Sequence, residues 1–148
     1  MSSRRMFLAS AGAISAGVTV PRVAQAYAPP PISGTVTIAV TGPFTGTDQR
    51  AGEQMANGVR AATDDANRFR GPLDRAYAMR TFDDQNLVAL GLQSAEFACD
   101  DQTICAVVGH LDGKVTELAL DTYAKNQMPV VCPAATFDRL TQHGYSDV

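Results

Sequence analysis

Apolar residues follow two different spacings along the chain after residue 34. Short runs rich in β-branched and apolar residues predict four strands, at residues 35–40, 77–82, 104–108 and 128–132. Between these runs, apolar residues recur every three or four positions, which predicts helices at residues 51–67, 88–99 and 115–125, with one more helical turn at 137–142. Strands and helices therefore alternate along the sequence.

The apolar positions of the helices also predict a core. The first predicted helix presents Met55, Val59, Ala62 and Ala66, and the other two present Leu92, Ala95, Phe97, Ala98, Leu118, Leu120 and Tyr123. The third strand is almost entirely apolar, so we expect it to be buried on both faces of the sheet.

The alternation of strands and helices predicts an α/β fold with a parallel sheet and helices on both of its faces. Only four strands are predicted, and no closing helix follows the fourth strand. A sheet that stops there leaves an open edge, which folded proteins normally cover. We therefore expect the chain to be part of a larger protein.

The first 26 residues have the three parts of a signal peptide. Arg4 and Arg5 begin it, a weakly apolar run covers residues 9–20, and a small-x-small cleavage site ends at Ala26. The segment Ser3–Leu8 resembles the twin-arginine export motif. An amphipathic helix or an ordinary secretory signal are the alternatives. The Pro-rich residues 27–34 are interpreted as a linker, and residues 35–148 as the folded part.

Composition narrows the classes of function. The 148 residues carry a net charge of −3 and no Trp, which disfavours nucleic-acid binding. No apolar run is long enough to span a membrane. The two His and three Cys match no zinc-site spacing. A bridge between Cys99 and Cys105 is possible in an oxidising compartment, and small buried thiols are the alternative.

Candidate chemistry lies at the carboxyl ends of the predicted strands, where parallel α/β sheets bind ligands. Residues 109–116 open the third predicted helix, which favours an anion there, although Asp112 capping that helix also explains the pattern. Residues 133–136 offer donors and acceptors for a small polar ligand or form a plain loop. Asp83 and Asp84 are a metal or phosphoacceptor pair, or acids that pair locally. The sequence lacks the Gly-x-Ser-x-Gly motif of a nucleophilic serine and the Gly-x-Gly-x-x-Gly motif of a dinucleotide-binding loop.

A set of motifs in order along residues 33–145 resembles the periplasmic leucine/isoleucine/valine-binding protein family, the type I solute-binding proteins of ABC importers. The resemblance rests on residues 38–46, Gly52, Gly58, Asp83–Asp84, residues 107–110, residues 133–136, Leu140–Thr141 and Gly144–Tyr145. It covers the N-terminal lobe of that fold, and covers it incompletely.

The resemblance implies a binding protein with no cofactor and no catalysis. It implies that Gly113 and Thr116 in the loop after the third strand, and Ala134 (through its carbonyl) and Thr136 in the loop after the fourth, contact an amino acid or related amide. Gly113 replaces a Ser common in the family, and Ala51 replaces an aromatic residue. The implied partner is the membrane permease of an ABC importer, and the implied location is the periplasm.

The sequence also allows other functions. A ligand-binding sensor or receptor domain of the same fold is one alternative, and a non-functional truncated fragment is another. An enzyme of the Rossmann-like class would need a cofactor fingerprint or a catalytic constellation, and the sequence has neither.

Overall fold

The computed structural model describes residues 34–69, 71–142 and 144 of the chain. The predicted signal peptide and all but the last residue of the predicted linker lie outside the described residues. The elements follow in the order β1 (Thr35–Gly42), α1 (Gln49–Arg68), the 3-10 turn η1 (Pro72–Asp74), β2 (Ala76–Asp83), α2 (Val88–Asp100), β3 (Ile104–Val108), α3 (Gly113–Lys125), β4 (Val130–Val131) and the 3-10 turn η2 (Asp138–Thr141).

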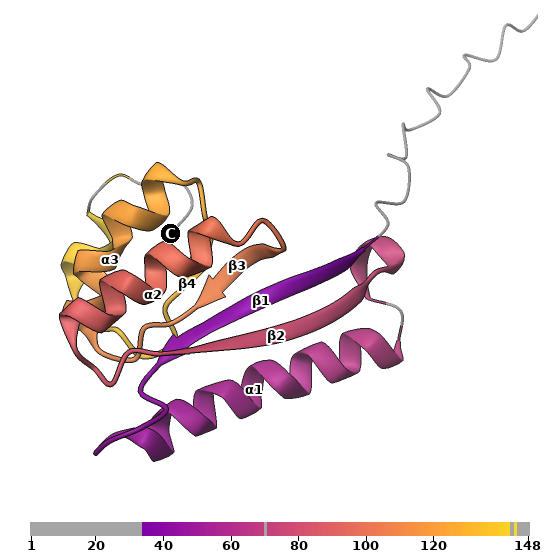
Figure 1. Cartoon of the computed structure of the whole chain (residues 1–148), viewed down its shortest axis with the longest axis horizontal. Helices are drawn as coiled ribbons and strands as arrows, with labels where there is room; N and C mark the ends of the chain where they lie inside the picture. Colours follow the sequence, from indigo (N-terminus) through magenta and orange to yellow (C-terminus); the bar gives the residue numbers. More distant parts are fainter. Residues whose placement is uncertain (1–33, 70, 143, 145–148) are drawn as a thin grey trace, which may run out of the picture.

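In the described part of the chain, four strands form one parallel sheet in the order β2-β1-β3-β4. Figure 1 shows α1 on one side of this sheet and α2 and α3 together on the other. The predicted α/β fold, with a parallel sheet and helices on both faces, is confirmed. Because β1 lies between β2 and β3, the loops that follow β2 and β3 lie on either side of the carboxyl end of β1.

The main core lies between the sheet and the pair α2 and α3. Small side chains bring the two helices close together: a Cβ added at Gly91 would lie 2.2 Å from Cγ1 of Val115. Burying apolar surface from three elements at once stabilises this side of the sheet. The buried cluster consists of Ala39, Ala95, Ala98, Ile104, Val107, Ala119, Tyr123, Met128 and Val130.

On the other face, α1 buries a different stripe from the predicted one. The residues that it buries are Gly52, Ala56 and Thr63, and Gly52 is required because a Cβ there would lie 2.1 Å from the carbonyl oxygen of Pro43. The predicted stripe instead lines open grooves beside α1. The groove over the middle of the sheet is lined by Ile38, Val59, Ala62, Thr63, Ala66, Tyr77, Ala106, Val108 and Val131.

This apolar groove also corrects the prediction for β3. The strand is covered on the side of α2 and α3, but Ala106 and Val108 on the side of α1 are half-buried, and Val131 on β4 is 60% exposed. Helix α1 packs chiefly on β2, and it leaves this half of its sheet face uncovered. The apolar sequence of β3 therefore does not mean that both of its faces are buried.

Three further predictions need correction. Phe97 and Leu118 were expected in the core but are 54% and 45% exposed, because the adjacent residues Ala98 and Ala119 occupy the buried sides of their helices. The fourth strand was predicted over five residues and pairs over two. Pro129 has no N–H to donate to the sheet, and the Met128 N–H donates to the Tyr123 carbonyl instead (2.9 Å), so pairing begins only at Val130.

The cysteines Cys99, Cys105 and Cys132 are free thiols, so the possible bridge between Cys99 and Cys105 is not formed. Cys105 is exposed, whereas the other two are half-buried, so the alternative of three buried thiols is also only partly correct. Burial raises the pKa of the Cys99 and Cys132 thiols. Within the described residues, none of the helices has the length and apolar character needed to cross a membrane.

Candidate functional site

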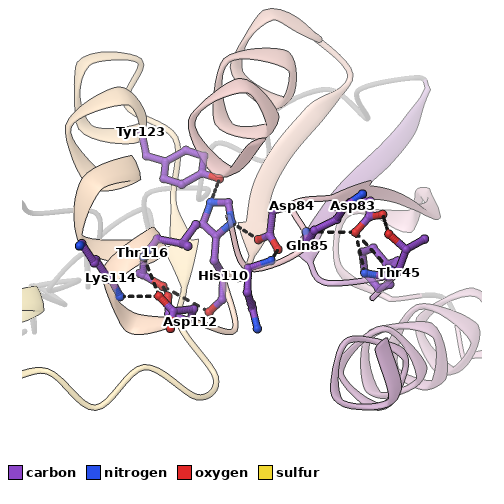
Figure 2. Close-up of polar contacts among 12 residues, drawn as sticks. Thr45, Asp83, Asp84, Gln85, His110, Asp112, Lys114, Thr116 and Tyr123 are labelled. Carbon is purple, nitrogen blue, oxygen red and sulfur yellow. Dashed lines mark hydrogen bonds and ion pairs between the residues drawn. The ribbon is translucent and has the colours of Figure 1, made fainter. Parts of the chain in front are cut away.

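The loops at the carboxyl ends of β1, β2 and β3 are tied together by carboxylates (Figure 2). Asp83 ends β2 and holds the loop after β1. Its Oδ1 accepts the backbone N–H of Phe44 (2.8 Å) and of Thr45 (3.3 Å), and its Oδ2 accepts the Thr45 hydroxyl (2.5 Å). Burial alone would raise the pKa of Asp83, but these hydrogen bonds and one from the Gln85 N–H outweigh it and lower that pKa.

Asp84, the next residue, points the other way and binds His110 at the end of β3. Its Oδ2 lies 2.6 Å from Nδ1 of His110, and its Oδ1 accepts the Asn86 N–H at 2.9 Å. The opposite nitrogen of the imidazole, Nε2, lies 3.0 Å from the hydroxyl of Tyr123 on α3. Asp84, His110 and Tyr123 are all 0% exposed, so this chain of polar groups is completely buried.

These contacts decide between the two interpretations of the acid pair. Each of the two carboxylates is used locally, one by the loop after β1 and the other by His110. Among the described residues, no group of three or more His, Cys, Asp or Glu side chains could hold a metal ion. The two acids therefore organise the loops at this end of the sheet.

The third carboxylate, Asp112, caps α3 as one interpretation of the sequence expected. It has extended backbone angles, and its Oδ1 accepts the N–H groups of Lys114 (2.9 Å) and Val115 (3.0 Å). Within the part of the chain that the structure describes, the N–H of Gly113, the first residue of the helix, has no acceptor. The start of a 13-residue helix thus offers one open donor together with the positive end of the helix dipole.

The sequence-predicted site residues differ in exposure. Gly113 is half-buried, whereas Ala134 and Thr136 in the loop after β4 are exposed. Thr116 is completely buried. Its hydroxyl lies 2.7 Å from the carbonyl oxygen of Asp112 and 3.3 Å from that of His110, so it fixes the loop instead of facing solvent.

The residues of the loop after β4 line two separate open hollows. Ala134 and Pro133 line a hollow of about 450 Å³ together with Leu111 from the loop after β3 and Ala51 from the start of α1. Thr136 lines a separate hollow of about 390 Å³ with Phe137, Asp138 and Arg139. The structure therefore brings Ala134 beside the loop after β3, and it places Thr136 in a different hollow.

Sequence reasoning missed Phe137 and the roles of His110 and Tyr123. A Cβ added at Gly113 would lie 2.9 Å from two ring carbons of Phe137, so this aromatic ring packs against the start of α3. Tyr123 was expected only as an apolar core residue. A signal for His110 was available, because a lone His and an acid pair both follow predicted strands of one parallel sheet and so lie at the same end of it.

Comparisons with known proteins fit this arrangement. The family described as periplasmic binding protein matches residues 35–146. The chain is 31% identical over 113 residues to the Leu/Ile/Val-binding protein BraC3 of Rhizobium johnstonii, over 76% of this chain and 30% of that protein. It is 29% identical over 111 residues to an amino acid binding protein of Pseudomonas aeruginosa, over 75% of this chain and 30% of that protein.

Solved structures show the same fold. An ABC transporter substrate-binding protein of Desulfitobacterium hafniense in complex with Leu superposes with a TM-score of 0.70 and 29% identity, over 78% of this chain and 33% of that chain. The branched-chain amino acid transporter substrate binding protein LivJ of Streptococcus pneumoniae in complex with isoleucine gives a TM-score of 0.69 and 23% identity, over 74% of this chain and 31% of that chain. The chain spans about a third of the length of these relatives.

Proposed function

Because the chain belongs to the periplasmic binding protein family, we propose that it carries one half of the solute site of an amino-acid-binding component of an ABC importer. The family consists of solute-binding proteins and not of enzymes, which confirms the prediction of a non-catalytic role. We further propose that the solute is a branched-chain amino acid or a related amide. The names of two similar proteins, one binding Leu/Ile/Val and one solved with Leu, support this class.

The observation that carries the proposal is the open N–H of Gly113 at the start of α3. A solute carboxylate placed there accepts this hydrogen bond and meets the positive end of the helix dipole. In this proposal the Ala134 carbonyl, in the exposed loop after β4, accepts a hydrogen bond from the solute ammonium. Thr136 lines a separate hollow in the structure, so its hydroxyl would reach the solute only when this exposed loop closes on it. Thr116 acts without touching the solute, because its hydroxyl holds the loop that presents Gly113.

In this proposal the other half of the site belongs to a second lobe, and the two lobes close on the solute. The relatives that the chain matches are about three times as long, which leaves room for such a lobe in them. The closed form would be recognised by the membrane permease. The family's name places its members in the periplasm, and we propose that residues 1–26 direct export there by the twin-arginine route, with residues 35–148 forming the N-terminal lobe.

Thermal unfolding of the full chain against the twenty amino acids, amides and urea tests the proposal. A solute that binds only the folded state raises the unfolding midpoint as its concentration increases. We expect L-leucine, L-isoleucine or L-valine, or an amide related to them, to raise it, and the other compounds to leave it unchanged.

Two variants at one position sharpen this test. Gly113→Pro removes the open N–H at a helix position that tolerates Pro, and it should abolish the shift. Gly113→Ala keeps the N–H while adding the same Cβ beside Phe137, and it should retain the shift. The proposal fails if no compound raises the midpoint, or if the Gly113→Pro protein responds like the wild type.

A further inference from the structure

We propose that Asp84, His110 and Tyr123 form a buried positioning unit, which sets the backbone of residues 109–112 and thereby places the solute-binding N–H of Gly113. The inference rests on the proposed function, and it assigns to these three residues a part in binding that none of them performs by contact. They come from three different parts of the fold, namely the loop directly after β2, the loop directly after β3 and the last turn of α3.

Burial makes this unit unusual for a purely structural feature. All three side chains are 0% exposed, and taking a carboxylate and an imidazole out of water costs free energy that their pairing recovers only with full hydrogen bonding. Here the bonding is complete. Asp84 uses one oxygen for His110 and the other for the Asn86 N–H, and Tyr123 occupies the remaining imidazole nitrogen.

The bonding also fixes the orientation of the imidazole ring. Oδ2 of Asp84 lies against Nδ1 of His110 and the Tyr123 hydroxyl lies against Nε2, so both ring nitrogens are held by a partner. Burial raises the pKa of the Tyr123 phenol, so the hydroxyl keeps its proton. Because none of the three side chains reaches solvent, they influence a solute only through the backbone that carries them.

That backbone is held on several sides. The N–H of Gly109 donates to the Val131 carbonyl at 3.0 Å. Gly109 has a φ of +145°, and a Cβ there would lie 2.1 Å from the Thr41 carbonyl oxygen, so the loop lies directly against the end of β1. The carbonyl of His110 accepts the Thr116 hydroxyl at 3.3 Å.

The fixed His110 is very close to the proposed solute contact. Only Leu111 and Asp112 separate His110 from Gly113, and Asp112 is itself fixed by capping α3. A segment this short, held at both ends, has little freedom to move. A change in the orientation of the imidazole would therefore move the Gly113 N–H at the start of α3.

The experiment compares conservative variants of the full chain. Asp84→Asn keeps the shape of the side chain and removes its charge, and Tyr123→Phe removes a single hydroxyl. Asp101→Asn is the matched control: it removes the carboxylate that pairs with Arg80 at 2.5 Å and receives the Thr103 hydrogen bonds just before β3, at the opposite end of the sheet. NMR titration with L-leucine gives affinity, and the heteronuclear NOE of the Leu111 amide reports loop order.

We expect Asp84→Asn and Tyr123→Phe each to weaken L-leucine binding by about tenfold, the effect of one lost buried hydrogen bond. We also expect both variants to lower the NOE at Leu111. The Asp101→Asn protein should keep its affinity and loop order even where its unfolding midpoint falls. Folded variants with unchanged affinity and unchanged Leu111 order would overturn the proposal. Should Asp84→Asn not fold, the milder Tyr123→Phe decides by the same measurements.

The loop-order measurement separates this inference from the function that it rests on. If the wild-type chain does not bind L-leucine, the proposed solute is wrong, but the Leu111 amide still reports on positioning. An ordered loop that loosens in both variants and not in the Asp101→Asn control then supports the positioning unit. A loop that stays ordered in both variants overturns it.

Discussion

The loops at the carboxyl ends of β1, β2 and β3 differ sharply from the loop after β4. Asp83 and Asp84 join the first three through contacts to Phe44 and His110, and Asp112 holds the third to the start of α3. The loop after β4, residues 133–136, is mostly exposed, and none of its residues makes a hydrogen bond to another described residue. The first three loops are therefore held in place before a solute binds, whereas the loop after β4 is not.

This difference matters for affinity. A preformed donor such as the Gly113 N–H meets a solute without a cost for ordering the loop, whereas the Ala134 carbonyl must be fixed when the solute arrives. Ordering those residues upon binding offsets part of the binding free energy. The proposed carboxylate contact should therefore be the stronger half of this site.

The largest effect is expected from breaking the buried unit outright. His110→Ala leaves the Asp84 carboxylate buried without its partner, which should lower the free energy of unfolding by about 3–5 kcal/mol. Urea unfolding of the wild-type and variant chains measures this difference. A loss below about 1 kcal/mol would mean that water readily replaces the imidazole, and that the first three loops are not held from inside.

A smaller effect is expected from removing the cap of α3. Asp112→Ala frees the N–H groups of Lys114 and Val115 and should cost about 1 kcal/mol, the usual value for a lost N-cap. Asp138→Ala is the control, because Asp138 begins the short η2 turn without making a side-chain cap there. Equal losses in urea unfolding for both variants would contradict the special role of Asp112.

The contribution of Asp83 should depend on pH. Its folded-state pKa is lowered below the ordinary value of 3.8, so the stability that it provides is present above that value and is lost as the pH falls through the folded-state pKa. Asp83→Asn should cost about 1 kcal/mol or less at neutral pH, since the group is half-exposed. The gap between wild type and variant should close in acid. Urea unfolding at several pH values tests this, and a gap independent of pH would contradict it.

The smallest effect is expected in the loop after β4. Thr136→Ala removes an exposed hydroxyl without a described hydrogen-bond partner, so stability should change by less than about 0.5 kcal/mol. In the amino-acid titration, however, the same variant should bind its solute more weakly. A clear loss of stability would show that this loop is held as firmly as the other three.

The fold could be predicted largely from the sequence because its signals are local. The β-branched residues of β1 and the three- or four-residue spacing in α1 to α3 each lie within one element. The capping role of Asp112 is equally local, since the carboxylate binds N–H groups two and three residues ahead. These features need no knowledge of which elements meet in space.

The features that were missed depend on which elements meet. Periodicity gave α1 an apolar stripe but could not show that only part of its sheet face is covered, so Val59 and Ala62 were assigned to the core and line a groove. Likewise, Asp84 and His110 follow strands that are not neighbours, and they meet across the end of β1. That contact requires the strand order, which the sequence does not state.

The strand order also has a consequence for synthesis. Among the strands that the structure describes, the first lies inside the sheet and the fourth at its edge, so each later strand adds to a strand that is already made. Chains emerge from the ribosome N-terminus first, and this sheet can therefore assemble in the order of translation. In that order β1, α1 and β2 are complete before β3 and the following loop supply His110 to Asp84. Of the four loops at the carboxyl ends of the strands, the loop after β4 is the last to be synthesised.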